Sequence, residues 1–150
     1  MKNTIKIANT QAFWGDRSEA SSELLEKQPD LDYLTLDYLS EVSLSIMAVQ
    51  REKDSQVGYA RDFIEVVKSL IPFWKNGSKV KVVTNAGGLN PRNCAEACIA
   101  ELKKAGLHSL KIAIVHGDDV LEVIKKNPLN PKFNNLESHE PISEVLERLT

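Results

Sequence analysis

The 150-residue chain lacks the features that define several large classes of protein. Its net charge is only −2, from 19 basic and 21 acidic residues, and no basic run is interleaved with aromatic residues. This balance argues against nucleic acid as a partner. No apolar run approaches the roughly 20 residues that span a bilayer, and the N-terminus lacks the apolar core of a secretory signal. We therefore expect a cytoplasmic protein with no membrane contact.

Cysteine and several nucleotide-binding motifs are also scarce or missing. The two cysteines, Cys94 and Cys98, are spaced for a helix face and not for a disulfide framework or a Cys-x-x-Cys zinc site. We interpret them as small apolar residues on a buried helix face. The chain has neither the Lys-Ser/Thr ending of a P-loop nor a Gly-x-Gly-x-x-Gly segment, which disfavours ATP and NAD. It also lacks the Gly-x-Ser-x-Gly elbow of a serine triad.

Strand and helix patterns alternate along a composition that is ordinary for a globular protein, 42% hydrophobic and 27% charged. Strands are expected at residues 4–8, 31–36, 79–84 and 110–115. Helices are expected at residues 17–28, 39–53, 59–76 and 91–105, in a short segment that begins after His116, and in a final turn or two over 142–149. The order βαβααβαβα predicts an α/β fold with a mostly parallel sheet of about four strands.

We expect one domain over residues 1–150, with an irregular loop and a C-terminal helix over residues 128–150. Four strands cannot close an eight-stranded barrel, so the sheet is either open or the front portion of a larger α/β domain. The helix over 59–76 carries the largest apolar face, and its Phe73–Trp74 corner belongs to the core or faces a partner. In the helix over 39–53 we expect the buried stripe to comprise Leu39, Val42, Ile46 and Val49.

The most informative segment, residues 80–92, joins a β-branched run to the start of a helix. In parallel sheets ligands bind beyond the carboxyl ends of the strands, and this loop is one of those ends. A helix N-terminus presents free N–H groups and partial positive charge, which suit a carboxylate or carbonyl. Asparagine amides and an arginine fork can add hydrogen bonds. The predicted ligand-binding residues here are Asn85, Gly87, Gly88, Asn90 and Arg92.

Acidic residues follow the other strands and give candidate catalytic groups. Asp16 could act as a general base or bind a cation, or it could cap the following helix in a box with Glu19. Arg17 could bind a phosphate or carboxylate, or it could be solvated. Asp37 and Glu41 lie one helical turn apart, so they could hold a divalent cation such as magnesium or divide acid and base roles. The alternative for this pair is helix capping with a solvated Glu41.

Two acidic residues and a histidine follow the fourth expected strand. Asp118 is a further candidate catalytic residue, with the same ambiguity between chemistry and helix capping that Asp119 shares. His116 is the one histidine placed for proton transfer, and a structural role is the alternative.

Several of these segments together resemble a known family. Their order and spacing are similar to the N-terminal part of the acyclic terpene utilization (AtuA) proteins, over residues 5–119. The segments that carry the resemblance are Phe13–Arg17, Val83–Arg92 and Gly117–Asp119, with Leu31–Leu34 and Leu39–Glu41 between them. The resemblance implies a bacterial cytoplasmic protein of acyclic terpene or branched-acid catabolism, in which intermediates are handled as coenzyme A thioesters. It also implies that this chain corresponds to the N-terminal part of a longer domain.

Two functional hypotheses follow. In the first, the chain is an enzyme, or part of one, of lyase or hydratase type that acts on an acyl-CoA or carboxylic acid at the C-terminal edge of the sheet. In the second, it is a non-catalytic subunit or interaction domain, completed by a second copy or a partner chain. Exposed sheet edges and the Phe73–Trp74 corner would then form the interface.

Overall fold

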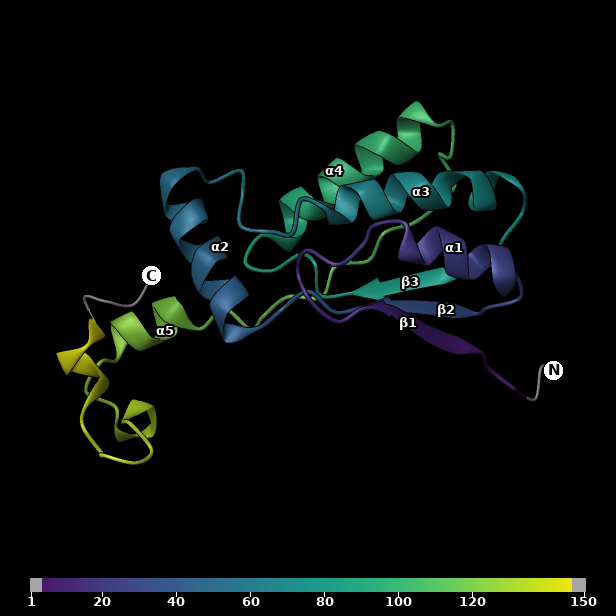
Figure 1. Ribbon diagram of the computed structural model, residues 1–150. Coiled ribbons are helices and arrows are strands. Elements are labelled where there is room, and N and C mark those ends of the chain that lie inside the picture. The colour runs from purple at the N-terminus through teal and green to yellow at the C-terminus, as the bar shows by residue number, and fades with distance from the viewer. Residues whose placement is uncertain (1–3, 147–150) are drawn as a thin grey trace. The chain divides into compact units, whose positions relative to one another are not determined.

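The computed structural model describes residues 4–146, and the chain divides into two compact units between Ile114 and Val115. The first unit contains a parallel sheet and four helices (Figure 1). Its elements are β1 (Ile7–Gln11), α1 (Ala20–Lys27), β2 (Tyr33–Leu36), α2 (Glu41–Lys53), α3 (Phe63–Lys75), β3 (Lys81–Thr84) and α4 (Pro91–Lys104). The second unit contains α5 (Leu121–Lys126) and the 3₁₀ turns η1 (Pro131–Phe133) and η2 (Ile142–Glu144). None of the helices described here has the length and apolar content to cross a membrane.

The sheet confirms the predicted α/β class and the parallel pairing. Its order is β1-β2-β3, and Leu34 of β2 lies opposite Ala8 of β1 and Val82 of β3. The prediction of a fourth strand is wrong, because residues 110–115 form no strand within the described part of the chain. Alternating apolar residues show how side chains are spaced, but a strand also needs a neighbouring backbone edge to pair with. The pattern of this segment did not contain that information.

Helices α1, α3 and α4 cover one face of the sheet (Figure 1). The core beneath them combines Leu34 and Leu36 from β2 with apolar side chains of α3 and α4. Cys94 and Cys98 are buried and unpaired on α4, which confirms their interpretation as small core residues. The Phe73–Trp74 corner is partly buried against the same core, and Trp74 Nε1 donates a hydrogen bond to the Val80 carbonyl at 3.2 Å.

The opposite face of the sheet is open. Ile7 and Val83 are 63% and 55% exposed, and they alternate with residues that face the helices. On this face the Lys81 ammonium lies 5.3 Å from the centre of the Tyr33 ring, a cation–π contact. The first unit therefore has a helical layer on one side of its sheet and exposed side chains on the other.

Helix α2 buries a different stripe from the one expected. A capping box between Ser40 and Ser43 begins the helix at Glu41. Ser43 and Met47 are buried, whereas Val42, Ile46 and Val49 are 45–69% exposed. Each residue advances about 100° around a helix, so burial of Met47 in place of Ile46 leaves Val42, Ile46 and Val49 facing outward. The expected stripe is therefore wrong for these three residues, whereas Leu39, which precedes the helix, is partly buried against the core.

Two further helix boundaries also differ from expectation. Helix α3 begins at Phe63, so residues 59–62 form an irregular approach to it and not its first turn. In the second unit only the 3₁₀ turn η2 is described within the helix expected over 142–149, and residues 147–149 lie outside the described residues. The irregular approach to α3 lines the pocket described next.

Candidate functional site

The three strands end at one edge of the sheet, where Asn85 connects two of the following loops. Its Nδ2 donates to Asp37 Oδ1 at 2.6 Å, and its Oδ1 accepts from the Tyr38 backbone N–H at 2.8 Å. The Asp37 backbone N–H donates to the Gln11 carbonyl at 3.0 Å, which links the end of β1 as well. The hydrogen bonds from the Asn85 side chain and the Leu39 backbone lower the pKa of Asp37. This edge therefore presents an exposed, ionised carboxylate that its neighbours hold in place.

The glycine pair after β3 packs inward against α2 and the segment before α3. Gly88 has a φ of +50°, and a Cβ there would overlap Met47 Sδ and lie 2.9 Å from the Gly58 carbonyl oxygen. A Cβ on Gly87 would lie 2.8 Å from Pro91 Cβ. The Leu89 backbone N–H donates to the Gly58 carbonyl at 2.9 Å. Close packing thus explains both glycines without a ligand.

Asn90 anchors the same loop from its other end. Its Nδ2 lies 2.9 Å from the carbonyl oxygens of both Ser55 and Val57, while its Oδ1 accepts from the Asn93 backbone N–H and caps α4. The amide is thus occupied by contacts within the fold. The loop after β3 and residues 55–58 form one joined wall at this edge of the first unit.

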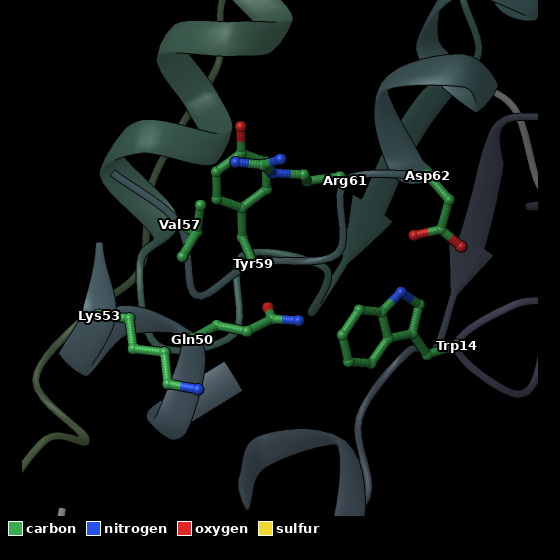
Figure 2. Close-up of a pocket in the computed structure, with 7 residues that line it drawn as sticks. All are labelled: Trp14, Gln50, Lys53, Val57, Tyr59, Arg61 and Asp62. Atoms are coloured by element: carbon green, nitrogen blue, oxygen red, sulfur yellow. The ribbon is translucent and has the colours of Figure 1, made fainter. Parts of the chain in front are cut away.

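A half-open pocket of about 360 Å³ lies beside that wall. It is lined by Trp14, Gln50, Lys53, Val57, Tyr59, Arg61 and Asp62 (Figure 2). Figure 2 shows the Trp14 indole and the Asp62 carboxylate facing one another, and the Gln50 amide pointing between them and the other residues. The lining therefore combines two cations, one carboxylate and two aromatic rings, and its cations and rings suit a ligand with an anionic group and an apolar body.

Asp62 is the only carboxylate among the residues that line this pocket, and its side chain has no evident role in folding. It occupies the N-cap position of α3 but makes no side-chain capping hydrogen bond. Its Oδ1 is buried and has no hydrogen-bond partner among the described residues. Buried carboxylate oxygens are normally satisfied, so this unpartnered oxygen is unusual in a folded protein.

Tyr38 lies next to this region, at the end of β2. It is 1% exposed, its ring packs edge-to-face on Phe63 with centroids 5.9 Å apart, and its hydroxyl has no partner within residues 4–146. Burial raises the pKa of Tyr38, and the negative charge of Asp62 raises it further. The phenol therefore stays protonated at neutral pH.

A comparison with family models now adds independent information. The model of the acyclic terpene utilisation family protein AtuA matches residues 5–150. The chain belongs to the AtuA family. Comparisons with curated proteins and with solved structures found no significant match. The resemblance drawn from the ordered loop segments is confirmed, and family membership indicates a role in acyclic terpene utilisation.

In this AtuA-family chain, the residues predicted after β1 make contacts within their own loop. Asp16 Oδ2 accepts from the Ala12 backbone N–H at 2.8 Å and closes the loop. It does not cap α1, whose N-cap is Glu19, so the capping-box alternative is wrong. Arg17 forms an ion pair with Glu23 of α1. Both residues are exposed at the edge where the strands end.

The remaining predicted residues divide between the two units of the AtuA-family chain. Glu41 and Arg92 are exposed in the first turns of α2 and α4. Ser40, and not Asp37, caps α2. Asp118 belongs to the second unit, where it is exposed together with His116. The role predicted for Asp118 therefore stays a prediction.

None of the seven residues that line the pocket was among the site residues predicted from the sequence. The expected helix over 59–76 included residues 59–62, which in the structure form the irregular approach to α3. Lys53 was considered only as the end of a helix. One signal could have corrected the boundary, because Asp62 is an acidic residue directly before an apolar helical run, which is typical of an N-cap. Among the described residues, no three His, Cys, Asp or Glu side chains cluster as metal ligands.

Proposed function

We propose that this chain carries the carboxylate-binding site of an enzyme of acyclic terpene or branched-acid catabolism. The substrate is a branched carboxylic acid or its coenzyme A thioester, and it binds in the pocket at the C-terminal edge of the sheet. The single observation that supports this most strongly is the pocket lining, which places Lys53 and Arg61 around the same cavity as Trp14 and Tyr59. Family membership supports the substrate class.

Each part of such a ligand has a complementary group in the pocket. A branched hydrocarbon contacts the Trp14 ring, the Tyr59 ring and Val57, where burial of apolar area favours binding. A carboxylate or phosphate binds the Lys53 ammonium or the Arg61 guanidinium. The reaction itself needs a carboxylate that takes a proton from carbon or water, as lyases and hydratases do. Asp62 lines the pocket, and Asp16 and Asp37 lie at the same edge of the sheet.

The loop predicted to bind the ligand has a supporting role in this proposal. Asn85 holds Asp37, while Asn90, Gly87 and Gly88 hold the wall formed with residues 55–58. Substitutions there should reduce binding indirectly, by displacing that wall. Arg92 is exposed at the start of α4 and could add a cation for the more distant phosphates of a thioester.

A binding titration tests this proposal with the branched acid 3-methylbutanoate and its coenzyme A thioester as probes. In a Trp74→Phe background the only tryptophan is Trp14, so its fluorescence reports pocket occupancy. We expect saturable binding, weakened about fivefold by Lys53→Gln and by Arg61→Gln, because each removes one charge-assisted hydrogen bond. The matched control is Lys75→Gln in the last turn of α3, which should bind as the parent does. Equal binding by all three variants would contradict the site.

A second candidate function is favoured by the open face of the sheet. Ile7 and Val83 are exposed on a face that the helices of the first unit leave uncovered. Apolar side chains that stay exposed on a sheet face can be buried when another chain packs against that face. In this alternative the chain is a subunit or interaction domain that another polypeptide completes. The partner binds the open face of the sheet, and the Phe73–Trp74 corner, which packs against the core, is not the interface.

A further inference from the structure

Two surfaces of the first unit keep apolar side chains exposed. One is the open face of the sheet, with Ile7 and Val83. The other is a stripe on α2, formed by Val42, Ile46 and Val49. The spacing of four and then three residues places these three side chains on one side of the helix. Burial of apolar area lowers the free energy, so each surface is a candidate for contact with another chain.

The open face of the sheet is suited to a helical layer. All-parallel sheets occur almost only in proteins whose helices cover both faces of the sheet. The strand register forms two rows across the open face, Ile7–Tyr33–Lys81 and Asn9–Thr35–Val83. Polar members of these rows contact one another, since Asn9 Nδ2 donates to Thr35 Oγ1 at 3.1 Å and the Lys81 ammonium lies over the Tyr33 ring. These contacts reduce the cost of burying the face beneath a helix.

Helix α2 has the length and the exposed side for this role. Its 13 residues span about 20 Å, enough to cover strands of four or five residues, which span about 13–17 Å. The six-residue α5 also exposes valines, but it has fewer than two turns. Met47 packs beside Gly88 in the loop after β3, which holds α2 beyond the end of the sheet in its own chain (Figure 1). An α2 that covers the open face therefore belongs to a second copy.

The charges of the two surfaces are complementary. Each residue advances about 100° around a helix, so Glu41 and Glu52 lie along one side of the α2 stripe. Neither glutamate forms an ion pair within the described part of the chain, and the Lys81 ammonium on the open face has no carboxylate partner there either. Lys53 continues the stripe at its end, but it lines the pocket of its own unit. Docking of α2 brings opposite charges together, whereas two open faces would oppose two Lys81 ammonium groups.

We propose that α2 of one copy covers the open sheet face of a second copy. The stripe of Val42, Ile46 and Val49 contacts the apolar side chains of the face, and the acidic side of α2 lies toward Lys81. This inference rests on the second candidate function, and it names the partner that completes the chain. Because two different surfaces meet, the contact is heterologous, and copies add head to tail into a ring or an open chain.

A complementation experiment tests this contact by sedimentation of the full chain. The parent should sediment above the mass of one chain. Ile46→Lys on α2 and Val83→Lys on the open face should each sediment as a monomer, because each buries an uncompensated charge in the contact. An equimolar mixture of these two variants should form a dimer with twice the mass of one chain. In that mixture the first variant supplies an intact open face and the second an intact α2.

Controls separate a lost contact from a lost fold. Ala100→Lys adds the same charge to an exposed position of α4 and should keep the parental mass. Ile46 and Val83 are exposed, so the thermal unfolding midpoints of their lysine variants should match that of the Ala100→Lys control. Lys81→Glu should weaken association about fivefold. Addition of Glu41→Lys and Glu52→Lys to the Lys81→Glu chain should restore most of that loss.

The outcomes distinguish this inference from the second candidate function. Monomeric Val83→Lys together with Ile46→Lys of parental mass would overturn the role of α2, and it would leave the open face as an interface for another surface. A mixture of the two variants that stays monomeric would also overturn the inference. A parent that is monomeric at high concentration would overturn the second candidate function and the inference together. Binding of a branched acid at Trp14 is a separate measurement that none of these results decides.

Discussion

At the scale of single residues, Asn85 shows how one side chain can organise the edge where strands end. An asparagine amide carries a donor and an acceptor on adjacent atoms. Here the donor holds the Asp37 carboxylate and the acceptor holds the backbone N–H of Tyr38. The position of the Tyr38 backbone therefore depends on the side chain of a residue 47 positions later in the chain.

Replacing that amide should destabilise the fold in a way that depends on pH. Asn85→Ala leaves the Tyr38 N–H without its acceptor, so we expect the free energy of unfolding to fall by about 1–2 kcal/mol near neutral pH. The lost hydrogen bond to Asp37 adds a second contribution to the free energy of unfolding, and this contribution depends on pH. The native pKa of Asp37 is lowered, so its stabilisation is present above the unfolded-state pKa and disappears as the pH falls through the native value.

Urea unfolding at neutral pH and at about pH 3 measures this effect, because the ordinary pKa of an aspartate is about 3.9. The difference between the parent and Asn85→Ala should shrink in acid. Asp37→Asn is the matched control, since it keeps a side-chain oxygen beside Asn85 but cannot titrate. If the NMR-measured pKa of Asp37 is the same with and without Asn85, the proposed coupling is absent.

At the scale of elements, the contact between α2 and the glycine loop determines the shape of the pocket wall. Met47 of α2 occupies the space beside Gly88 where a side chain would project, and Gly58 hydrogen-bonds to the next residue of the loop. This contact explains why α2 buries Met47 and leaves Ile46 exposed. It also places the end of α2, with Gln50 and Lys53, beside the pocket.

Gly88→Ala should therefore be more costly than a glycine substitution elsewhere at positive φ. Backbone strain costs about 1 kcal/mol, and displacement of Met47 and the Gly58 carbonyl should add about 1–3 kcal/mol. Gly77→Ala is the control, because Gly77 has a φ of +89° but nothing lies within 4 Å of the added Cβ. Chemical denaturation should show a loss for Gly88→Ala that clearly exceeds the loss for Gly77→Ala. Equal losses of stability in the two variants would mean that positive φ alone, and not contact with Met47, explains the glycine at position 88.

The elements also show which features the sequence could predict. The spacing in β1, β2 and β3 and the Asn90–Pro91 start of α4 were sufficient to predict a parallel α/β fold, because those signals are local. The stripe of α2 could not be predicted, since which side of the helix is buried depends on Gly88, which lies 41 positions after Met47 in the chain. The pocket was missed for the same reason: Trp14, Lys53 and Asp62 come from three separate segments whose proximity is a property of the folded unit.

At the scale of the whole molecule, the open face of the sheet raises the question of what covers it. The second candidate function predicts that the protein associates in solution through this face. We expect sedimentation to give a mass above the 16.7 kDa of one chain, and Val83→Lys to restore the monomer by placing a charge on the open face. Lys79→Glu, outside β3, should keep the parental mass. A parent that stays monomeric at high concentration would contradict this alternative.

The central claim, that the pocket beside Trp14 binds a branched carboxylate, is tested most directly by NMR. The chain has two tryptophans, so a ¹⁵N–¹H spectrum contains two indole signals that Trp74→Phe assigns. Trp14 lines the pocket, whereas the Trp74 indole donates to the Val80 carbonyl elsewhere in the first unit. Titration with 3-methylbutanoate should shift the Trp14 signal saturably and leave the Trp74 signal in place. An unchanged Trp14 signal, or equal shifts of both signals, would contradict the account.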